Sequence, residues 1–380
     1  MTVRTTVVVA ATAVALTAGF AAPAMGAGGG AGGHDATRNA VRAAVQDGVP
    51  GVTLTAKDGR STWSTTAGAG NLTTHAPRSA DDRYRVGSIT KTFVSTVLLQ
   101  LEAEGRLSLD DTVEKWLPGA VHGNGHDGSR ITVRQLLNHT SGIFNYTADE
   151  TFGRTYFLKD GFFEHRYDTK TPEQLVAVAM AHRPDFAPGT SWKYSNTNYV
   201  VAGMVIQKVT GRSYGEEVRH RVIDPLHLTA TSVPGTRVTV PRPSSRAYSK
   251  LAQTATGPTY DVTRLNPSLA SSAGEMISDS ADLDRFYAAL LKGRLLPPKQ
   301  LKEMKTTVAV EGIPNAGYGL GLIDRELSCG VHVWGHDGGI HGSNSVAVTT
   351  ADGRHSVAFN FNGDWSGDTD AVVEAEFCGE

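Results

Sequence analysis

Charge of either sign is scarce in this sequence, and neither sign is in excess. Of the 380 residues, 19% are charged, and 36 lysines and arginines stand against 38 aspartates and glutamates. With a net charge of −2 and no run of basic residues, the protein has no positive electrostatic field that would attract nucleic acid. We therefore expect no nucleic-acid partner. Apolar residues still make up 40%. This composition excludes collagen-like, coiled-coil and wholly disordered chains and allows a large core.

Long apolar runs are missing after the N-terminal region. Arg4 precedes an uncharged apolar stretch at 7–22, and small residues follow it. The stretch is too short and too rich in Ala and Thr for a transmembrane helix, but it has the pattern of a secretory signal. We predict a signal peptide at 1–26, a flexible Gly-rich leader at 27–37, and a secreted protein without a stable membrane anchor.

Cysteine is nearly absent, with only Cys329 and Cys378 present. In an oxidising compartment these two residues can form one bridge. The bridge would close a loop of about fifty residues and contribute roughly 4 kcal/mol in the chain-entropy model. Two unrelated reduced thiols are the alternative.

Turn signals and hydrophobic periods divide the chain into three parts. Strands are expected at both ends, as hairpins around Asp58-Gly59 and Asp352-Gly353 and at 320–323 and 331–334. Helices are expected at 38–47, 93–101, 199–209, 283–291 and 369–377. The pattern predicts an α+β fold, in which one antiparallel sheet is built from both chain ends, is flanked by helices and receives an inserted, mostly helical lobe.

This pattern also predicts how the domain is divided. A single domain spans 38–380. Its α/β part comprises 38–85 and 316–380, and its helical part with loops comprises 86–315.

The nucleophile-elbow pattern G-x-S-x-G occurs at Gly211-Arg-Ser213-Tyr-Gly215. An elbow needs a preceding strand, whereas a helix is expected before this motif. Ser213 and Glu216 instead have the spacing of a capping box. We therefore interpret this motif as structural.

The pattern S-x-x-K occurs at Ser88-Ile-Thr-Lys91, at the start of an apolar helix. Three residues apart on a helix, the two side chains share a face, so that the amine can reach the hydroxyl. The helix start also offers unpaired N–H groups to an oxyanion. Lys91 can take a proton from Ser88 only if its pKa is lowered. The alternative is a capping serine beside a solvated lysine.

Two further motifs carry chemistry only in combination. Tyr194-Ser195-Asn196 offers a phenol for proton transfer and an amide for a substrate carbonyl. His336 is followed by Asp337, Gly338 and Gly339 on an expected strand, where glycines allow close approach of a ligand. Taken singly, the first motif is an ordinary loop and His336 is a surface histidine.

The order S-x-x-K, Y-x-N, H-x-G resembles the penicillin-recognising serine hydrolases with a β-lactamase/transpeptidase-like fold. It is most similar to secreted D-alanyl-D-alanine carboxypeptidases of actinomycete type and to class C β-lactamases. Supporting stretches are Leu136-Leu-Asn-His-Thr-Ser-Gly-Ile143, Pro188-Gly-Thr-Ser-Trp-Lys-Tyr-Ser-Asn-Thr-Asn198 and Gly317-Tyr-Gly-Leu-Gly-Leu322. The resemblance covers approximately 38–380. It also implies a bridge between Cys329 and Cys378.

The resemblance implies an acyl-enzyme mechanism. Ser88 attacks a carbonyl, Lys91 and Tyr194 manage protons, with Tyr194 helped by Lys91 as the favoured base, and Asn196 positions the substrate amide. His336 stands where many relatives have a lysine.

The same resemblance places Asp337, Gly338 and Gly339 along the bound substrate. The backbone N–H groups of Ser88 and Gly339 would form the oxyanion hole.

Some positions depart from the pattern of the D-alanyl-D-alanine carboxypeptidases. Those relatives place hydroxyl residues after the histidine, and a basic residue after the Gly-Leu-Gly-Leu stretch, to hold a terminal carboxylate. Here these positions are Asp337, Gly339 and Ile323. An anionic Asp337 would repel a carboxylate, unless Arg325 compensates.

The leading prediction is a D-alanyl-D-alanine carboxypeptidase or a related D-amino-acid peptidase. It would act on peptidoglycan-like peptides or other small acyl substrates, with β-lactams as covalent inhibitors. An esterase, an amidase, a β-lactamase and a non-catalytic penicillin sensor on the same fold remain open.

A metallohydrolase is the alternative of a different class. His122, His126 and Asp127 are close in sequence, but they occupy a Gly/Asn/Asp loop without a second ligand group at zinc-site spacing. We therefore expect neither a metal nor another cofactor.

Ser88→Ala should abolish covalent labelling by a fluorescent penicillin, because the acyl bond requires the serine oxygen. Gel fluorescence of the variant and the wild type checks this, and equal labelling would refute the site.

If His336 contributes charge, activity should depend on pH between about 5 and 8, where an unperturbed histidine titrates. A flat pH profile for both the wild type and His336→Lys would remove that role.

Overall fold

The structure is a computed structural model that describes residues 34–310, 313 and 315–379. The predicted signal peptide at 1–26 and most of the predicted leader lie outside this range. Helix α1 (Asp35–Gln46) begins inside the last part of that leader, where Thr37 is buried and donates a hydrogen bond to Glu376. Within the described ranges, no helix has both the length and the hydropathy needed to cross a membrane.

Eight antiparallel strands form the main sheet, in the order β2-β1-β14-β13-β12-β11-β10-β9. The strands are β1 (Gly51–Asp58), β2 (Ser61–Gly68), β9 (Val308–Ala309), β10 (Ala316–Tyr318), β11 (Ile323–Glu326), β12 (His332–Ile340), β13 (Ser343–Thr350) and β14 (His355–Phe361). Both predicted hairpins are present, and β1 pairs with β14 from Val52↔Phe361 to Asp58↔His355. The prediction of one sheet built from both chain ends is confirmed.

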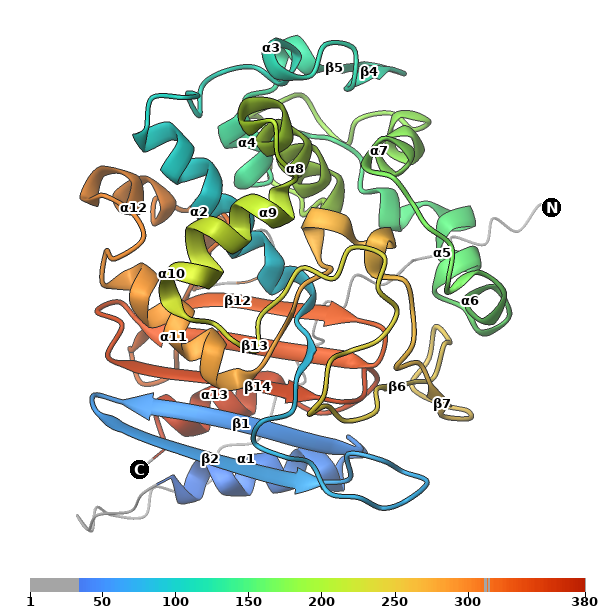
Figure 1. Ribbon diagram of the computed structural model, residues 1–380, viewed down its shortest axis with the longest axis vertical. Coiled ribbons are helices and arrows are strands. Elements are labelled where there is room, and N and C mark those ends of the chain that lie inside the picture. Colours follow the sequence, from blue (N-terminus) through green and yellow to red (C-terminus); the bar gives the residue numbers. More distant parts are fainter. Residues whose placement is uncertain (1–33, 311–312, 314, 380) are drawn as a thin grey trace, which may run out of the picture.

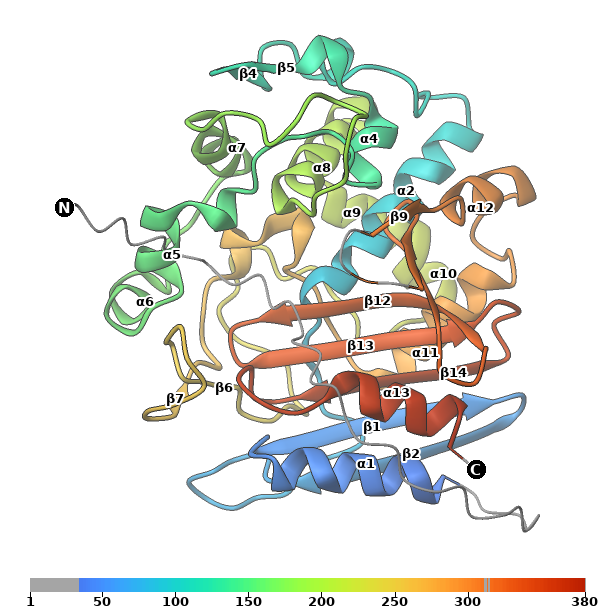
Figure 2. The ribbon, with the colours of Figure 1, turned by 180° about the vertical axis from the view of Figure 1, so that it is seen from behind.

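Helices cover the two faces of this sheet (Figures 1 and 2). Helices α1 and α13 (Thr369–Phe377) lie on one face, whereas α11 (Ser280–Leu291) and the helical lobe lie on the other. The other helices are α2 (Thr90–Ala103), α3 (Val113–Trp116), α4 (Val133–Leu137), α5 (Glu150–Tyr156), α6 (Lys159–His165), α7 (Pro172–Met180), α8 (Asn196–Thr210), α9 (Tyr214–Val218), α10 (Asp224–Leu226) and α12 (Pro298–Met304). Short paired strands are β3 (Tyr84–Arg85), β4 (His122–Gly123), β5 (His126–Asp127), β6 (Tyr248–Ser249), β7 (Tyr260–Asp261) and β8 (Ile277–Ser278).

Helix α2 runs through the middle of the molecule and is buried on every side over its first three turns. The predicted apolar face is present, with Phe93 and Val97 fully buried. The polar residues between them are buried as well, and they are hydrogen-bonded as buried polar groups require. Thr92 donates to the Gly321 carbonyl at 2.7 Å, and the Ser95 hydroxyl lies 3.0 Å from that of Tyr199.

The predicted strand at 320–323 is wrong. The chain turns at this point, and β11 begins only at Ile323. Gly321 has a φ of +71°, and a Cβ there would lie 2.4 Å from the Ser95 hydroxyl oxygen. The turn is therefore fixed by contact with α2, which the alternating pattern of apolar residues does not reveal. The strand predicted at 331–334 lies almost entirely within β12.

The G-x-S-x-G motif is structural, as predicted. Ser213 caps α9 through a hydrogen bond from Glu216 N, and the Glu216 side chain accepts one from Ser213 N. Gly211 ends α8 with a φ of +74°.

Cys329 and Cys378 form a disulfide, with Cα atoms 5.6 Å apart. The bond joins the loop between β11 and β12 to the residue that follows α13. The predicted pairing is confirmed.

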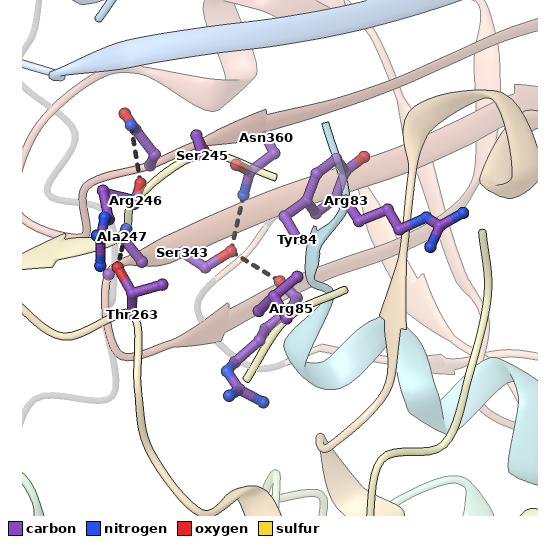
Figure 3. Close-up of a pocket in the computed structure, with 12 residues that line it drawn as sticks. Arg83, Tyr84, Arg85, Ser245, Arg246, Ala247, Thr263, Ser343 and Asn360 are labelled. Carbon is purple, nitrogen blue, oxygen red and sulfur yellow. Dashed lines mark hydrogen bonds between the residues drawn. The ribbon is translucent and has the colours of Figure 1, made fainter. Parts of the chain in front are cut away.

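Buried side chains fix the segment before Ser88 on the sheet. The Arg78 guanidinium donates to Asp82, to the Gly51 carbonyl and to Asn360. Asn360 in turn donates to Ser343, whose hydroxyl donates to the Arg85 carbonyl, each at 2.7 Å (Figure 3). The chain that enters α2 is therefore tied to β1, β13 and β14.

Arg78→Ala should lower the free energy of unfolding by about 3–5 kcal/mol, because it leaves the buried Asp82 carboxylate without its partner. Urea denaturation followed by circular dichroism measures this change. Arg60→Ala, in the exposed turn between β1 and β2, is the matched control and should change stability by no more than about 0.5 kcal/mol. Equal losses for the two variants would contradict the role of Arg78.

Candidate active site

Ser88 lies in a 3-10 turn, Gly87–Ile89, that leads directly into α2. Two glycines allow this turn to lie against β12. A Cβ on Gly87 would be 2.8 Å from Gly339 N, and one on Gly338 would be 2.7 Å from Ser88 N. The backbone nitrogens of Ser88 and Gly339, the predicted oxyanion donors, thus lie at one contact between turn and strand.

Lys91 is fully buried beside Ser88. Its Nζ lies 2.8 Å from Ser88 Oγ, 2.8 Å from Asn196 Oδ1 and 2.7 Å from the Ala273 carbonyl oxygen. Burial holds its pKa well below the ordinary lysine value, and Asp337 opposes this effect. A solvated lysine beside a capping serine is therefore excluded.

The contacts around Lys91 can be met by an uncharged amine, which is the form that the lowered pKa favours. Asn196 Oδ1 and the Ala273 carbonyl can only accept hydrogen bonds, so they take the two N–H groups of a neutral amine. The lone pair then faces the Ser88 hydroxyl, which is the arrangement that proton removal from a serine requires.

Tyr194 completes the group. Lys91 Nζ lies 4.8 Å from the centre of the Tyr194 ring. Burial raises the pKa of the phenol well above 10, and a hydrogen bond with Ser88 opposes this effect. The phenol therefore stays protonated at neutral pH. The structure brings Ser88, Lys91 and Tyr194 together, as the sequence predicts.

Asn196 is the first residue of α8, and two polar residues that the sequence reasoning missed hold it. Asn145 Oδ1 accepts from Asn196 N at 3.1 Å, and Thr147 Oγ1 accepts from Asn196 Nδ2 at 3.2 Å. These contacts orient the amide so that its oxygen faces Lys91.

His336 lies on β12 and is 2% exposed, so the interpretation as a surface histidine is wrong. Its Nδ1 faces the Asp337 carbonyl, and its Nε2 lies 2.9 Å from the Tyr318 hydroxyl. Burial lowers the pKa of His336 to about 4. The ring is then neutral between pH 5 and 8, so a pH dependence of activity in that range would come from another group.

Asp337 is the exposed acid next to these buried groups, and its side chain is 71% exposed. Its charge raises the pKa of Tyr194 and opposes the lowering at Lys91, so it acts electrostatically on the centre of the site. Arg325, the possible compensating charge, instead forms an ion pair with Asp370 of α13.

Part of β12 has a neighbour on one side only. Strand β11 pairs with β12 from Glu326↔His332 to Ile323↔Gly335, whereas β13 pairs with β12 as far as Ile340. The backbone of 336–340 is therefore left without a β11 partner next to Ser88. An extended substrate can pair with such an edge.

The sequence reasoning also missed His139, which appeared only inside a supporting stretch. It is fully buried, and its ring centre lies 4.3 Å from that of Tyr194 and 4.7 Å from that of Tyr318. Only the tertiary contacts reveal that it belongs to the site.

His122 and Asp127, considered above as metal ligands, pair across β4 and β5. Over the ranges that the structure describes, no three His, Cys, Asp or Glu side chains are grouped as a metal site requires. The site around Ser88 is built from hydroxyl, amine, amide and imidazole groups.

Relatives in sequence include a penicillin-binding protein. The chain is 24% identical over 332 residues to penicillin-binding protein 4* of Bacillus subtilis, covering 82% of this chain and 68% of that protein. It is 27% identical over 277 residues to protein flp of Staphylococcus aureus, covering 70% of this chain and 51% of that protein. The chain thus spans 68% and 51% of the length of these two relatives.

Two solved structures share the whole fold. A D-stereospecific amidohydrolase from Streptomyces sp. is 64% identical with a TM-score of 0.87, covering 91% of this chain and 99% of that one. The D-amino acid amidase from Ochrobactrum anthropi SV3, complexed with L-phenylalanine, is 28% identical with a TM-score of 0.77, covering 90% and 98%.

The model of the family described as Beta-lactamase matches residues 37–376. Together with the fold and these relatives, this match shows that the chain belongs to the beta-lactamase family and is a serine hydrolase of the penicillin-recognising type.

Proposed function

We propose that this serine hydrolase cleaves amide bonds of small D-amino-acid amides and peptides through an acyl-enzyme on Ser88. Lys91 is the base, because burial lowers its pKa and its Nζ lies 2.8 Å from Ser88 Oγ, within reach of the proton. This differs from the expectation that Tyr194 is the base, because the raised pKa of the phenol disfavours a tyrosinate.

The chemical steps follow from these positions. Lys91 takes the Ser88 proton while Ser88 Oγ bonds to the substrate carbonyl carbon. The carbonyl oxygen becomes an anion that the N–H groups of Ser88 and Gly339 stabilise. The carbon–nitrogen bond then breaks, and the leaving amine receives a proton through Tyr194. Water hydrolyses the ester by the same route, with Lys91 again as the base.

Asn196 and the free edge of β12 position the substrate. The Asn196 amide is already oriented by Asn145 and Thr147, so it can meet a substrate amide without reorganisation. The substrate backbone lies along 336–340, and the buried His336 ring beside it keeps its hydrogen bonds to Tyr318 and to the Asp337 carbonyl.

The observation that favours an amide over a carboxypeptidase substrate is the exposed Asp337 beside the site, with Arg325 paired elsewhere. A terminal carboxylate would meet like charge, whereas an amide or a cationic group would not. The 64% identity to the D-stereospecific amidohydrolase supports D-stereospecificity. A D-alanyl-D-alanine carboxypeptidase on peptidoglycan-like peptides is the second candidate, which the penicillin-binding relatives favour.

We also propose that the protein is secreted and that β-lactams acylate Ser88 slowly. The N-terminal signal pattern and the Cys329–Cys378 bridge support export to an oxidising compartment. Penicillins carry a carboxylate, so Asp337 would slow their reaction for the same reason that it disfavours carboxypeptidase substrates.

Asp337→Asn should reduce the preference of the enzyme for D-Ala-D-Ala amide over D-Ala-D-Ala with a free carboxylate. Removal of a nearby like charge should narrow the ratio of kcat/KM values about tenfold. Steady-state assays on both substrates, with D- and L-phenylalanine amide as the stereochemical test, measure this effect.

Asp58→Asn is the matched control, because it removes the same charge at the exposed end of β1. An unchanged ratio in Asp337→Asn, or an equal change in Asp58→Asn, would count against the assigned substrate. Faster hydrolysis of the L enantiomer would refute D-stereospecificity.

The rate of acylation should rise with pH as Lys91 loses its proton, and the lowered pKa of Lys91 moves this rise below the ordinary lysine range. His336→Gln should leave the midpoint of the rise unchanged, because His336 has a pKa of about 4 and is already neutral. The pH profile of kcat/KM for a short-chain ester, which does not titrate, measures this. A displacement by about one pH unit or more in the variant would contradict it.

A further inference from the structure

Tyr194 lies in a segment that has no secondary structure of its own. Residues 181–195 between α7 and α8 contain neither helix nor strand. A phenol that transfers protons must nevertheless keep its position relative to Ser88 within a fraction of an ångström. Other parts of the chain must therefore hold this segment.

His139 contacts this segment on both sides of Tyr194. The His139 carbonyl accepts from Lys193 N at 3.1 Å, and its Nδ1 accepts from Ser195 N at 3.2 Å. Asn198 Nδ2, one turn into α8, also lies 3.1 Å from Nδ1. The imidazole ring packs on the Tyr194 ring between these contacts, with centres 4.3 Å apart.

The protonation state of His139 follows from these contacts. Two N–H groups point at Nδ1, so Nδ1 is the bare nitrogen and Nε2 carries the hydrogen. Nε2 has no hydrogen-bond partner among the residues that the structure describes. Burial, with smaller contributions from Lys91 and His336, holds the pKa of His139 well below the ordinary value. The polar contacts of the neutral ring are thus directed at the segment that carries Tyr194 and at the start of α8.

The backbone at His139 has an uncommon conformation. It follows the end of α4 with a φ of +62°, in the left-handed region where Asn, Asp and His are the most frequent residues after Gly. This conformation lets the backbone carbonyl and the side chain of the same residue both face the 193–195 segment.

We propose that His139 is a positioning residue that holds Tyr194 at Ser88. Its backbone carbonyl binds the residue before Tyr194, and its side chain binds the residue after it. This inference rests on the proposed role of Tyr194 as the proton-transfer group. His139 has no part in the chemistry itself, because it acts through the segment that it binds.

The test compares three variants of the full chain. His139→Asn keeps an acceptor, Oδ1, two bonds from Cβ and tolerates a positive φ. His139→Gly tolerates the same φ without any side-chain acceptor, so the two variants differ in the hydrogen bond rather than in backbone strain. His341→Asn is the matched control, since His341 is another buried histidine, bonded to the Tyr156 carbonyl and packed on Phe162, away from Tyr194.

With D-phenylalanine amide, and with kcat expressed per folded molecule by circular dichroism, His139→Gly should lower kcat about 100-fold with little change in KM. His139→Asn should stay within about tenfold of the wild type, because the acceptor is restored. His341→Asn should lower the melting temperature while keeping kcat. A merely structural role of His139 would instead lower stability in both of its variants and leave kcat per folded molecule unchanged.

A double variant links the effect to the phenol. Tyr194→Phe should itself lower kcat by about 100-fold or more, and His139→Gly should add little in that background. If Tyr194→Phe keeps the wild-type kcat, the proposed role of Tyr194 is wrong, and the inference fails with it. Suppose instead that Tyr194→Phe is impaired. The inference about His139 alone is then overturned by any of three results: His139→Gly is as active as His341→Asn, His139→Asn is no more active than His139→Gly, or the losses of kcat in Tyr194→Phe and His139→Gly multiply in the double variant.

Discussion

The burial of one amine governs this site. Lys91 is enclosed by Ser88, by Asn196 Oδ1 and by the Ala273 carbonyl, which belong to three different segments of the chain. A buried lysine is costly when charged and inexpensive when neutral, so the fold itself selects the form that can accept a proton. Helix α2 must therefore be buried on all sides where it carries Lys91, and the sheet, α8 and the 271–276 segment provide that enclosure.

The remaining features of the site follow from the approach of β12 to the start of α2. Gly87 and Gly338 have no side chains at the point of contact, so the two backbones meet and the nitrogens of Ser88 and Gly339 both lie at this contact. The same strand carries His336, buried and neutral, and Asp337, exposed and charged. Two adjacent residues of one strand thus face different surroundings: His336 is buried in the catalytic site, and Asp337 is exposed where the substrate is selected.

Local signals allowed much of this structure to be predicted. The turns at Asp58-Gly59 and Asp352-Gly353 determine their hairpins within a few residues, and the Ser88–Lys91 spacing depends only on helix geometry. Predictions failed where contacts between residues far apart in the sequence determine the local structure. The turn at Gly321 depends on contacts with Thr92 and Ser95, and the burial of His336 depends on its contact with Tyr318. His139 was missed because its contacts join segments fifty or more residues apart.

The order of the segments along the chain has a consequence for when the site can assemble. Ser88 and Lys91 leave the ribosome early, but β12, which supplies Gly339 and encloses the amine from one side, is among the last segments to be made. A nascent chain therefore holds an unassembled nucleophile until its final strands join the sheet. Such late long-range pairing folds slowly, but it keeps an acylating serine inert until the molecule is whole.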